Sequence, residues 1–197
     1  MFQVIDNFVS NGYATELENM CRTEVPWFID ENISGTDEAK APNYKKYNAP
    51  GANYDGPQYG FGHWALHPTG VKSSFFEKVY PLVYALEEKA NISIKELYRI
   101  RLALTTSVGK EVQHLPHVDD SEPHKVLLYY VNDSDGDTFM FNEMYSPEDG
   151  RSLTNFTIKQ RVQPKKNRAI VFDGLTFHNS SKPVKNTSRY IINIDFN

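Results

Sequence analysis

The sequence predicts a mainly β protein: a double-stranded β-helix, or jelly-roll barrel, with flanking N-terminal helices packed on it. Three observations lead to this fold class. Short runs of alternating apolar and polar residues recur through the second half of the 197-residue chain. Turn-forming segments such as Asp133-Ser134-Asp135-Gly136 separate these runs. Helical spacing of apolar residues is found only in the first hundred residues, and helices followed by many short strands favour a barrel of two antiparallel sheets.

Two helices are predicted in the N-terminal half. The alternating residues 1–8 indicate a strand, and residues 10–21 then indicate an amphipathic helix that packs on a sheet. A second helix begins near Ser74, with Glu77 three residues later at the spacing of a capping box. Pro81 is expected to kink or interrupt this helix.

The stretch from Asp30 to Gly70 is rich in Gly, Pro, Asn and Tyr and has little sustained period. A long irregular segment is usually functional or disordered. Its many aromatic residues argue against disorder, so we expect a lid or a substrate-facing surface. The residues expected to face a substrate are Tyr59, Phe61 and Trp64.

Strands are predicted over the rest of the chain, at residues 98–105, 125–131, 138–144, 155–162, 169–173 and 189–196. The length suits one compact domain. We therefore expect a single domain over 1–197, with an N-terminal helical and lid region at 1–97 and the jelly-roll core at 98–197.

Composition narrows the function classes. A formal charge of −4 and a pI near 5.9 disfavour a protein whose affinity comes from neutralising nucleic-acid phosphates. The one cysteine, Cys21, excludes an internal disulfide and a thiolate metal cluster and points to a reducing compartment. No basic start with a long apolar run suggests a signal peptide, and no stretch approaches the roughly 20 apolar residues of a membrane span. We expect a cytoplasmic protein without a membrane partner.

Three residues are candidate metal ligands. His117 and Asp119 are two residues apart, so on an extended backbone their side chains share a face. His178 follows a strong apolar strand and is far enough along the chain for a barrel to bring it to the same point. Two histidines and one carboxylate form the facial triad of non-haem iron(II) sites, which leaves three coordination positions open.

The other four histidines are weaker candidates. His63 and His67 are four residues apart, but Gly62 and Pro68 flank them and favour a loop. His114 precedes His117 by three residues, and Pro116 between them breaks a helical arrangement. His124 precedes a strand, so the surface is its expected place.

Arg189 adds a second kind of site. It lies eleven residues beyond His178, at the start of a strand in which Ile191, Asn193 and Asp195 share its face. Its guanidinium can bind a carboxylate through two parallel hydrogen bonds. A site for a carboxylate near the metal is thus predicted.

With these residues the chain resembles the 2-oxoglutarate/iron(II) dioxygenases, within them the prolyl 4-hydroxylase-like group. The marks are His117-Val118-Asp119, the segment Leu127-Leu128-Tyr129-Tyr130-Val131-Asn132, His178 and Arg189. The resemblance covers residues 98 to 197 and implies Fe(2+), 2-oxoglutarate as cosubstrate and O2, with ascorbate as a supporting reductant. It also implies that Tyr130 and Arg189 hold the distal carboxylate of the cosubstrate.

Two departures from the group's pattern affect the site. Where relatives carry a tyrosine before the His-x-Asp pair, this chain has Leu104-Thr105-Thr106-Ser107, so Thr105 or Ser107 is expected to take its place. Asn193, on the face of Arg189, is a further candidate for cosubstrate contact. The group's Gly-Gly signature is replaced by Asp135-Gly136-Asp137-Thr138, so substrate preference is not carried over.

The resemblance implies hydroxylation of a peptidyl or free amino-acid side chain, with conversion of 2-oxoglutarate to succinate. Because Asp119 is present, no coordination position is freed for halide. Two alternatives stay open: the same chemistry on a nucleobase or small metabolite, and a jelly-roll metal-binding module without turnover. The nucleobase version is disfavoured because Asp195 stands where nucleic-acid demethylases carry a second arginine. The identity of the substrate and the oligomeric state are left open.

Overall fold

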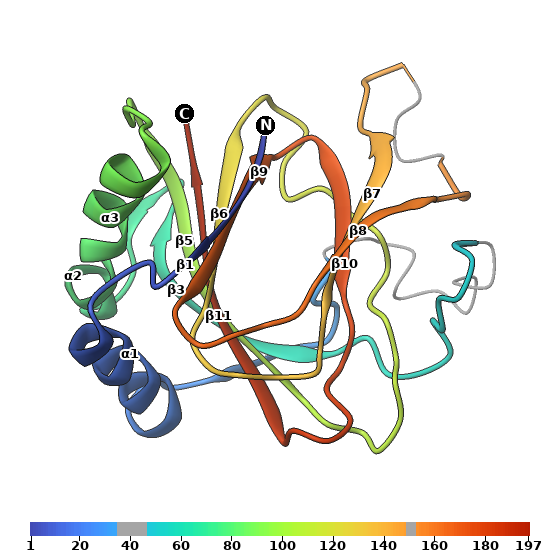
Figure 1. The fold of residues 1–197 in the computed structure, drawn as a ribbon, viewed down its shortest axis with the longest axis horizontal. Helices are drawn as coiled ribbons and strands as arrows, with labels where there is room; N and C mark the ends of the chain where they lie inside the picture. The colour runs from blue at the N-terminus through green and yellow to red at the C-terminus, as the bar shows by residue number, and fades with distance from the viewer. Residues whose placement is uncertain (35–46, 149–152) are drawn as a thin grey trace.

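The computed structural model describes residues 1–34, 47–148 and 153–197. Two antiparallel sheets face each other, and three helices lie to one side of them (Figure 1). The prediction of a mainly β jelly-roll fold with helices packed on it is confirmed. Residues 35–46 of the lid predicted over Asp30–Gly70 lie outside the described residues.

The major sheet has eight strands in the order β1-β9-β6-β11-β5-β3-β2, with β4 paired to β3. Their bounds are β1 Phe2–Asp6, β2 Phe28–Asp30, β3 Gly60–His67, β4 Gly70–Val71, β5 Leu97–Thr106, β6 Lys125–Tyr130, β9 Arg168–Asp173 and β11 Ser188–Phe196. The minor sheet has the order β10-β7-β8, with β7 at Thr138–Met144, β8 at Ile158–Val162 and β10 at Thr176–Ser180.

The helices are α1 Asn11–Thr23, α2 Phe75–Val79 and α3 Pro81–Ala90. Ser10 caps α1, because its side chain accepts a hydrogen bond from the amide of Tyr13. Pro81 separates α2 from α3, as predicted. The predicted capping box was wrong, since Ser74 stands at the N-cap of α2 without a side-chain cap bond.

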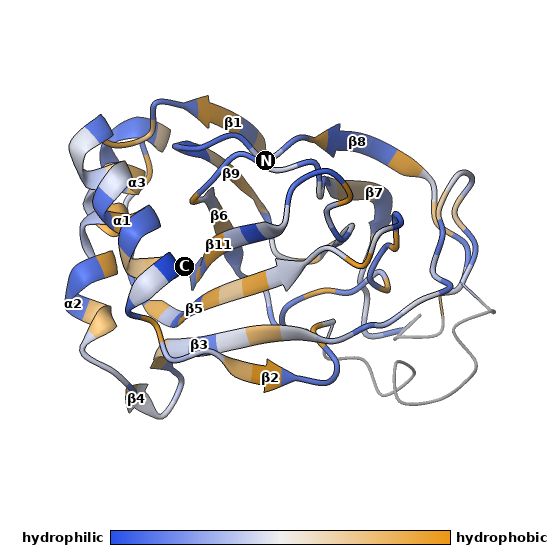
Figure 2. Cartoon of the chain, turned by 90° about the horizontal axis from the view of Figure 1, so that it is seen from below, coloured by the Kyte–Doolittle hydropathy of each residue, from blue (hydrophilic) through white to orange (hydrophobic). Residues whose placement is uncertain are grey.

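Because successive side chains of a strand point to opposite faces, the strands of the major sheet contribute to two hydrophobic cores. On β6, Leu127 and Tyr129 pack in the cluster that includes the helices, whereas Leu128 and Tyr130 pack in the cluster between the two sheets. Hydrophobic and hydrophilic residues likewise follow one another along β11 (Figure 2). The face of β11 that carries Arg189 therefore points into the barrel.

The expectation of an irregular stretch from 30 to 70 was wrong for its last part. Residues 60–67 form β3, which pairs with β5, so His63 and His67 lie on a strand and not in a loop. Glycines at positions 60 and 62 conceal the strand in the sequence, although both lie where a side chain would collide with Ile33 or Arg101. The strand β1 also joins the sheet, beside β9.

Within the described residues, none of the helices has the length and apolar character that crossing a membrane requires.

Candidate metal centre

The three predicted ligands lie together between the sheets. His178 stands on β10, and His117 lies opposite it in the segment after β5, where the two residues exchange backbone hydrogen bonds of 3.0 and 2.9 Å. Asp119 follows on the same strand-like segment. One candidate ligand atom from each of the three residues falls within a group whose members are all within 4.8 Å of one another. Such a His-Asp-His arrangement can bind a metal ion.

Both imidazoles are oriented by the backbone. The Nδ1 of His117 is 3.0 Å from the carbonyl oxygen of Leu115, and the Nδ1 of His178 is 3.1 Å from that of Thr176. A carbonyl oxygen only accepts, so each Nδ1 carries the proton and each Nε2 keeps its lone pair for a metal. Burial lowers the pKa of His117 to about 4 and also lowers the pKa of His178, so both rings are neutral at pH 7.

The carboxylate of Asp119 is held from two sides. Its Oδ2 accepts a hydrogen bond from Asn193 at 3.0 Å and lies 3.7 Å from the Nε2 of His178. Its Oδ1 lies 2.7 Å from the guanidinium of Arg99 on β5. Burial, the largest single influence, would raise the pKa of Asp119, but the charge of Arg99 and the other neighbouring groups, including the hydrogen bond from Asn193, together hold this pKa well below its usual value. Asp119 is therefore an anionic ligand candidate.

Arg189 is a buried cation without an acidic partner. Only 3% of its surface is exposed, and no carboxylate among the described residues lies within 4.0 Å of it. Its Nη2 donates to the hydroxyl of Thr138 at 2.9 Å, and that hydroxyl also accepts from Tyr130 at 2.8 Å. The guanidinium carbon lies 5.7 Å from the centre of the Tyr130 ring. Nε of Arg189 has no hydrogen-bond partner within the described chain.

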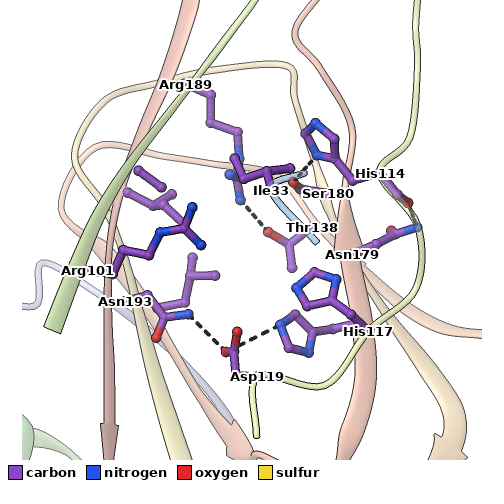
Figure 3. Close-up of a pocket in the computed structure, with 14 residues that line it drawn as sticks. Ile33, Arg101, His114, His117, Asp119, Thr138, Asn179, Ser180, Arg189 and Asn193 are labelled. Atoms are coloured by element: carbon purple, nitrogen blue, oxygen red, sulfur yellow. Dashed lines mark hydrogen bonds and ion pairs between the residues drawn. The ribbon is translucent and has the colours of Figure 1, made fainter. Parts of the chain in front are cut away.

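A pocket joins the three candidate ligands to Arg189. Figure 3 shows the side chains of Asp119, His117, Arg101 and Arg189 around one cavity, which Asn193 and Thr138 also line. Several buried polar atoms at or beside this pocket lack a partner among the described residues: Thr105 Oγ1, His114 Nε2, Asn193 Oδ1 and Arg189 Nε. Carboxylate oxygens of a ligand would accept from the donors among these atoms, the Nε of Arg189 and the hydroxyl of Thr105.

Thr105 and Asn193, both predicted to contact a cosubstrate, lie in different parts of this site. Thr105 stands opposite Arg189 in the register of β5 and β11, with 1% of its surface exposed. Asn193 stands opposite Arg101 and donates to Asp119, so it helps to fix the carboxylate of that candidate ligand. Their roles toward a cosubstrate stay predictions.

None of the three residues predicted to face a substrate lines the pocket. Phe61 stands opposite Leu104, on the other face of the sheet from Arg101, and contacts Tyr59 edge to face. Trp64 lies nearer, because the guanidinium carbon of Arg101 is 5.5 Å from the centre of its ring. Of the three, Trp64 is the one adjacent to the site.

The weaker histidines are also accounted for. His63 contacts the carbonyl oxygen of Pro26 and the hydroxyl of Ser73, at 3.1 and 2.9 Å, on the helix side of the sheet. The surface position expected for His124 was wrong, since its exposure is 6% and its ring packs on Gly174. His114 is fully buried at the pocket and contacts Ser180, but it does not belong to the group of candidate ligands.

Sequence reasoning assigned no role in the site to Arg99, Arg101 or Thr138, and it gave His114 only the role of a weaker ligand candidate. The arginines did carry a signal, because a strand that alternates Arg99 and Arg101 with apolar residues places two cations on its inner face. Thr138 was predicted only as the end of a turn segment and the first residue of a strand. Its importance depends on the approach of β7 to β11, which no local pattern reveals.

The residues fit an iron(II) ion and a dicarboxylate. Two neutral Nε2 atoms and one carboxylate suit iron(II). The orphaned Nε of Arg189 and the orphaned hydroxyl of Thr105 provide donors for a carboxylate at a fixed position in the same pocket.

Comparisons with known proteins support the fold. No family model matches the sequence, and no curated protein matches it. Among solved structures, a prolyl hydroxylase of Trichoplax adhaerens, in complex with a hypoxia-inducible factor peptide fragment, is 15% identical with a TM-score of 0.55; the alignment covers 99% of this chain and 82% of that one. A prolyl-4-hydroxylase of Pseudomonas putida is 12% identical with a TM-score of 0.55, covering 99% and 91%.

The non-haem α-ketoglutarate-dependent epimerase SnoN from nogalamycin biosynthesis gives a TM-score of 0.64 at 12% identity, covering 99% of this chain and 77% of that one. At sequence identities of 12% to 15%, the similarity to these structures shows the fold alone. This fold is the one shared by prolyl hydroxylases and non-haem 2-oxoglutarate-dependent enzymes, and the resemblance found in the sequence is confirmed at that level.

Proposed function

We propose that this protein is an iron(II)- and 2-oxoglutarate-dependent oxygenase. The observation that carries the proposal is the buried, acid-free Arg189 in the same pocket as the His117-Asp119-His178 triad. A buried cation without a counter-ion is costly unless a ligand supplies the charge. A triad alone would support only a metal site of unknown purpose, and Arg189 adds the place for an anionic cosubstrate.

Each residue has a separate task in this proposal. His117, Asp119 and His178 hold the metal, with Asn193 and Arg99 fixing the position of Asp119. Arg189 binds the distal carboxylate, while the hydroxyl of Thr138 holds Arg189 in place. Iron(II) with bound 2-oxoglutarate supplies the oxidation of a C–H bond by O2, with release of CO2 and succinate.

Thr105 is the residue that we propose in place of the tyrosine expected before the His-x-Asp pair. Its position opposite Arg189 supports this role, because residues paired across two strands present their side chains side by side on one face. Tyr130 donates its hydroxyl proton to Thr138 and stacks beside Arg189, so we propose that it positions the arginine.

For the reaction we propose hydroxylation of an amino-acid side chain, free or within a peptide. Likeness to prolyl hydroxylases favours this outcome, whereas likeness to SnoN keeps a small metabolite as the alternative. The complete triad supports hydroxylation over halogenation. The one cysteine, Cys21, is a free thiol, which fits the reducing cytoplasmic setting that we also propose.

The test is a mass-spectrometric assay with iron(II), 2-oxoglutarate and ascorbate under air. Free amino acids and proline-, lysine- and asparagine-containing peptides are supplied as substrates, and we expect one of them to gain one oxygen atom with release of succinate. His178→Ala should abolish both products. If iron and 2-oxoglutarate bind but neither product forms with any substrate, the protein is a metal-binding module and the proposal is wrong.

A further inference from the structure

The pairing of β11 with β5 shows in which order the residues of the site follow one another along the barrel. Arg189 pairs with Thr105, Asn193 pairs with Arg101, and Asp195 pairs with Arg99. Asn193 bonds the candidate ligand Asp119, so the metal centre is level with the middle of this series. Asp195 lies six residues beyond Arg189, about 20 Å along the strand. In Figure 1, β11 runs upward in this direction to the C-terminus.

A second cavity, of about 610 Å³, opens at the Asp195 end. It is lined by Pro68, Tyr98, Arg99, Asp120, Glu122, Pro123, His124, Asp195 and Asn197. Arg99 separates it from the metal centre, because the guanidinium lies 2.7 Å from Asp119 on one side and its Nε lies 2.6 Å from Asp195 on the other. If the cosubstrate occupies the Arg189 end, this cavity offers a place for part of a substrate, separated from the candidate metal centre by the side chain of Arg99.

The cavity has an acidic lining. Asp120, Glu122 and Asp195 contribute three carboxyl groups, whereas Arg99 is the one cation and already contacts two carboxylates. Within the described residues, neither Asp120 nor Glu122 forms an ion pair within 4.0 Å. The cavity therefore offers charge to a cation without breaking an existing pair.

Asp195 gives an independent sign of a ligand. Its side chain is 3% exposed, and its Oδ1 has no hydrogen-bond partner in the described part of the chain. Burial and the nearby charge of Asp119 raise the pKa of Asp195 well above its usual value, so an ammonium donor from a ligand in the cavity would both satisfy Oδ1 and stabilise the charged form. Its Oδ2 is the atom near Arg99, so Oδ1 can accept without displacing that arginine.

We infer that this cavity binds a cationic amine group of the substrate, with Asp120, Glu122 and Asp195 as the residues that select it. The inference rests on the proposed function for its link to the metal, and it narrows the substrate to a molecule with an ammonium group. Tyr98 adds an aromatic ring to the same lining, which suits a cation.

An anionic substrate is the competing possibility, because Arg101 also lines the metal pocket. Arg101, however, donates its Nη2 to Asp30 on β2, so its charge is already paired. Arg101 also packs against Trp64 and against Gly62, where a Cβ would lie 3.1 Å from its Nε. The contacts of Arg101 thus explain its position without a substrate anion.

The test compares three probes of similar size by isothermal titration: the Nα-acetyl methylamides of lysine, norleucine and glutamate. Titrations use the whole protein with manganese(II) and 2-oxoglutarate, and are repeated without either. The lysine probe should bind at least about tenfold more tightly than the norleucine probe, since the two differ mainly in the ammonium group. This preference should persist without metal, because no metal ligand lines the cavity.

The variant D120N/E122Q should bind the lysine probe about three- to tenfold more weakly, while its affinity for norleucine stays the same. The matched control E77Q/E88Q removes two carboxylates from helices α2 and α3 and should keep the wild-type preference. Tighter binding of the glutamate probe, equal binding of lysine and norleucine, or no binding of lysine would each overturn the inference. Lysine binding by a protein that binds neither iron nor 2-oxoglutarate would keep the cavity and overturn the proposed function.

Discussion

Arg189 and Thr105 lie directly opposite each other in β11 and β5, and each carries a buried polar atom without a partner among the described residues. Two neighbouring orphaned donors are unusual in a folded protein, where most buried polar groups are hydrogen-bonded. Both residues lie at or beside the pocket of the candidate metal centre. A ligand bound there would supply the hydrogen-bond partners that they lack.

Replacing Arg189 by Met should weaken 2-oxoglutarate binding on the order of 100-fold, because charge-assisted hydrogen bonds to its carboxylate are lost. Isothermal titration in the presence of manganese(II) measures this change. Metal affinity should stay the same. The thermal midpoint of the metal-free protein should not fall, since the change removes a buried charge without a counter-ion. Arg22→Met, at an exposed arginine of α1, is the control, and equal 2-oxoglutarate affinity in both variants would refute the role of Arg189.

Replacing His178 by Ala should reduce iron(II) or manganese(II) affinity by about 100-fold or more, since even the outer partners of metal ligands are worth roughly 10- to 100-fold. The measurement is an anaerobic metal titration. His67→Ala is the matched control, because His67 lies on β3 and contacts Thr69 instead of the centre. Unchanged affinity in His178→Ala would show that the three residues do not form the metal site.

The Gly136→Ala substitution should destabilise the fold by about 2 kcal/mol. A Cβ at Gly136 would lie 2.6 Å from the carbonyl oxygen of Ser181, just after β10, and 3.1 Å from Cδ of Arg189, so the backbone at Ser181 or the side chain of Arg189 would have to shift. Gly12→Ala is the control: it lies in α1 with no atom within 4 Å of the added Cβ, and should stabilise by about 0.5–1 kcal/mol. Urea denaturation measures both, and a neutral Gly136→Ala would contradict the close packing around Arg189.

Lys182 should make stability depend on alkaline pH. It is fully buried, its Nζ donates to the carbonyl oxygen of Tyr59 at 2.7 Å, and burial lowers its pKa from 10.5 to about 8. Between pH 8 and 10.5 the unfolded chain holds a proton that the folded chain has lost, so the free energy of unfolding rises with pH over this window. Below pH 8 this contribution is constant.

Comparing wild type with Lys182→Met by urea denaturation at several pH values isolates this contribution. The stability of wild type relative to the variant should increase from pH 8 to pH 10.5, whatever the offset caused by losing the bond to Tyr59. A difference that stays flat across this range would mean that the ammonium is well solvated in the folded protein.

The sequence predicted those parts of the molecule whose signals are local. Alternation along β5, β6 and β11 gave both the strands and their inner faces, and the spacing of His117 and Asp119 on an extended segment gave their common direction. The eleven-residue separation of His178 and Arg189 was enough to expect both near one point of a barrel. These local patterns were reliable because alternation along a strand directly determines which side chains share a face.

What the sequence did not reveal depends on contacts between distant segments. Strand β3 was missed because Gly60 and Gly62 look like loop residues, whereas here they leave room for Ile33 and Arg101. The link from Asp119 through Arg99 to Asp195 joins three separate strands or segments, and its partners are fixed only when the sheet closes. Thr138 likewise becomes part of the site only through its hydrogen bonds to Arg189 and Tyr130.

The central claim is that the triad and Arg189 together form one site for iron(II) and 2-oxoglutarate. An anaerobic titration of the iron(II)-loaded protein with 2-oxoglutarate, followed in the visible range, tests it most directly, because a 2-oxo acid chelated to iron(II) gives a charge-transfer band. We expect a saturable band in wild type, saturation only at much higher 2-oxoglutarate in Arg189→Met, and no band in His178→Ala. A wild-type protein that binds iron(II) yet gives no band at any concentration of 2-oxoglutarate would contradict the account.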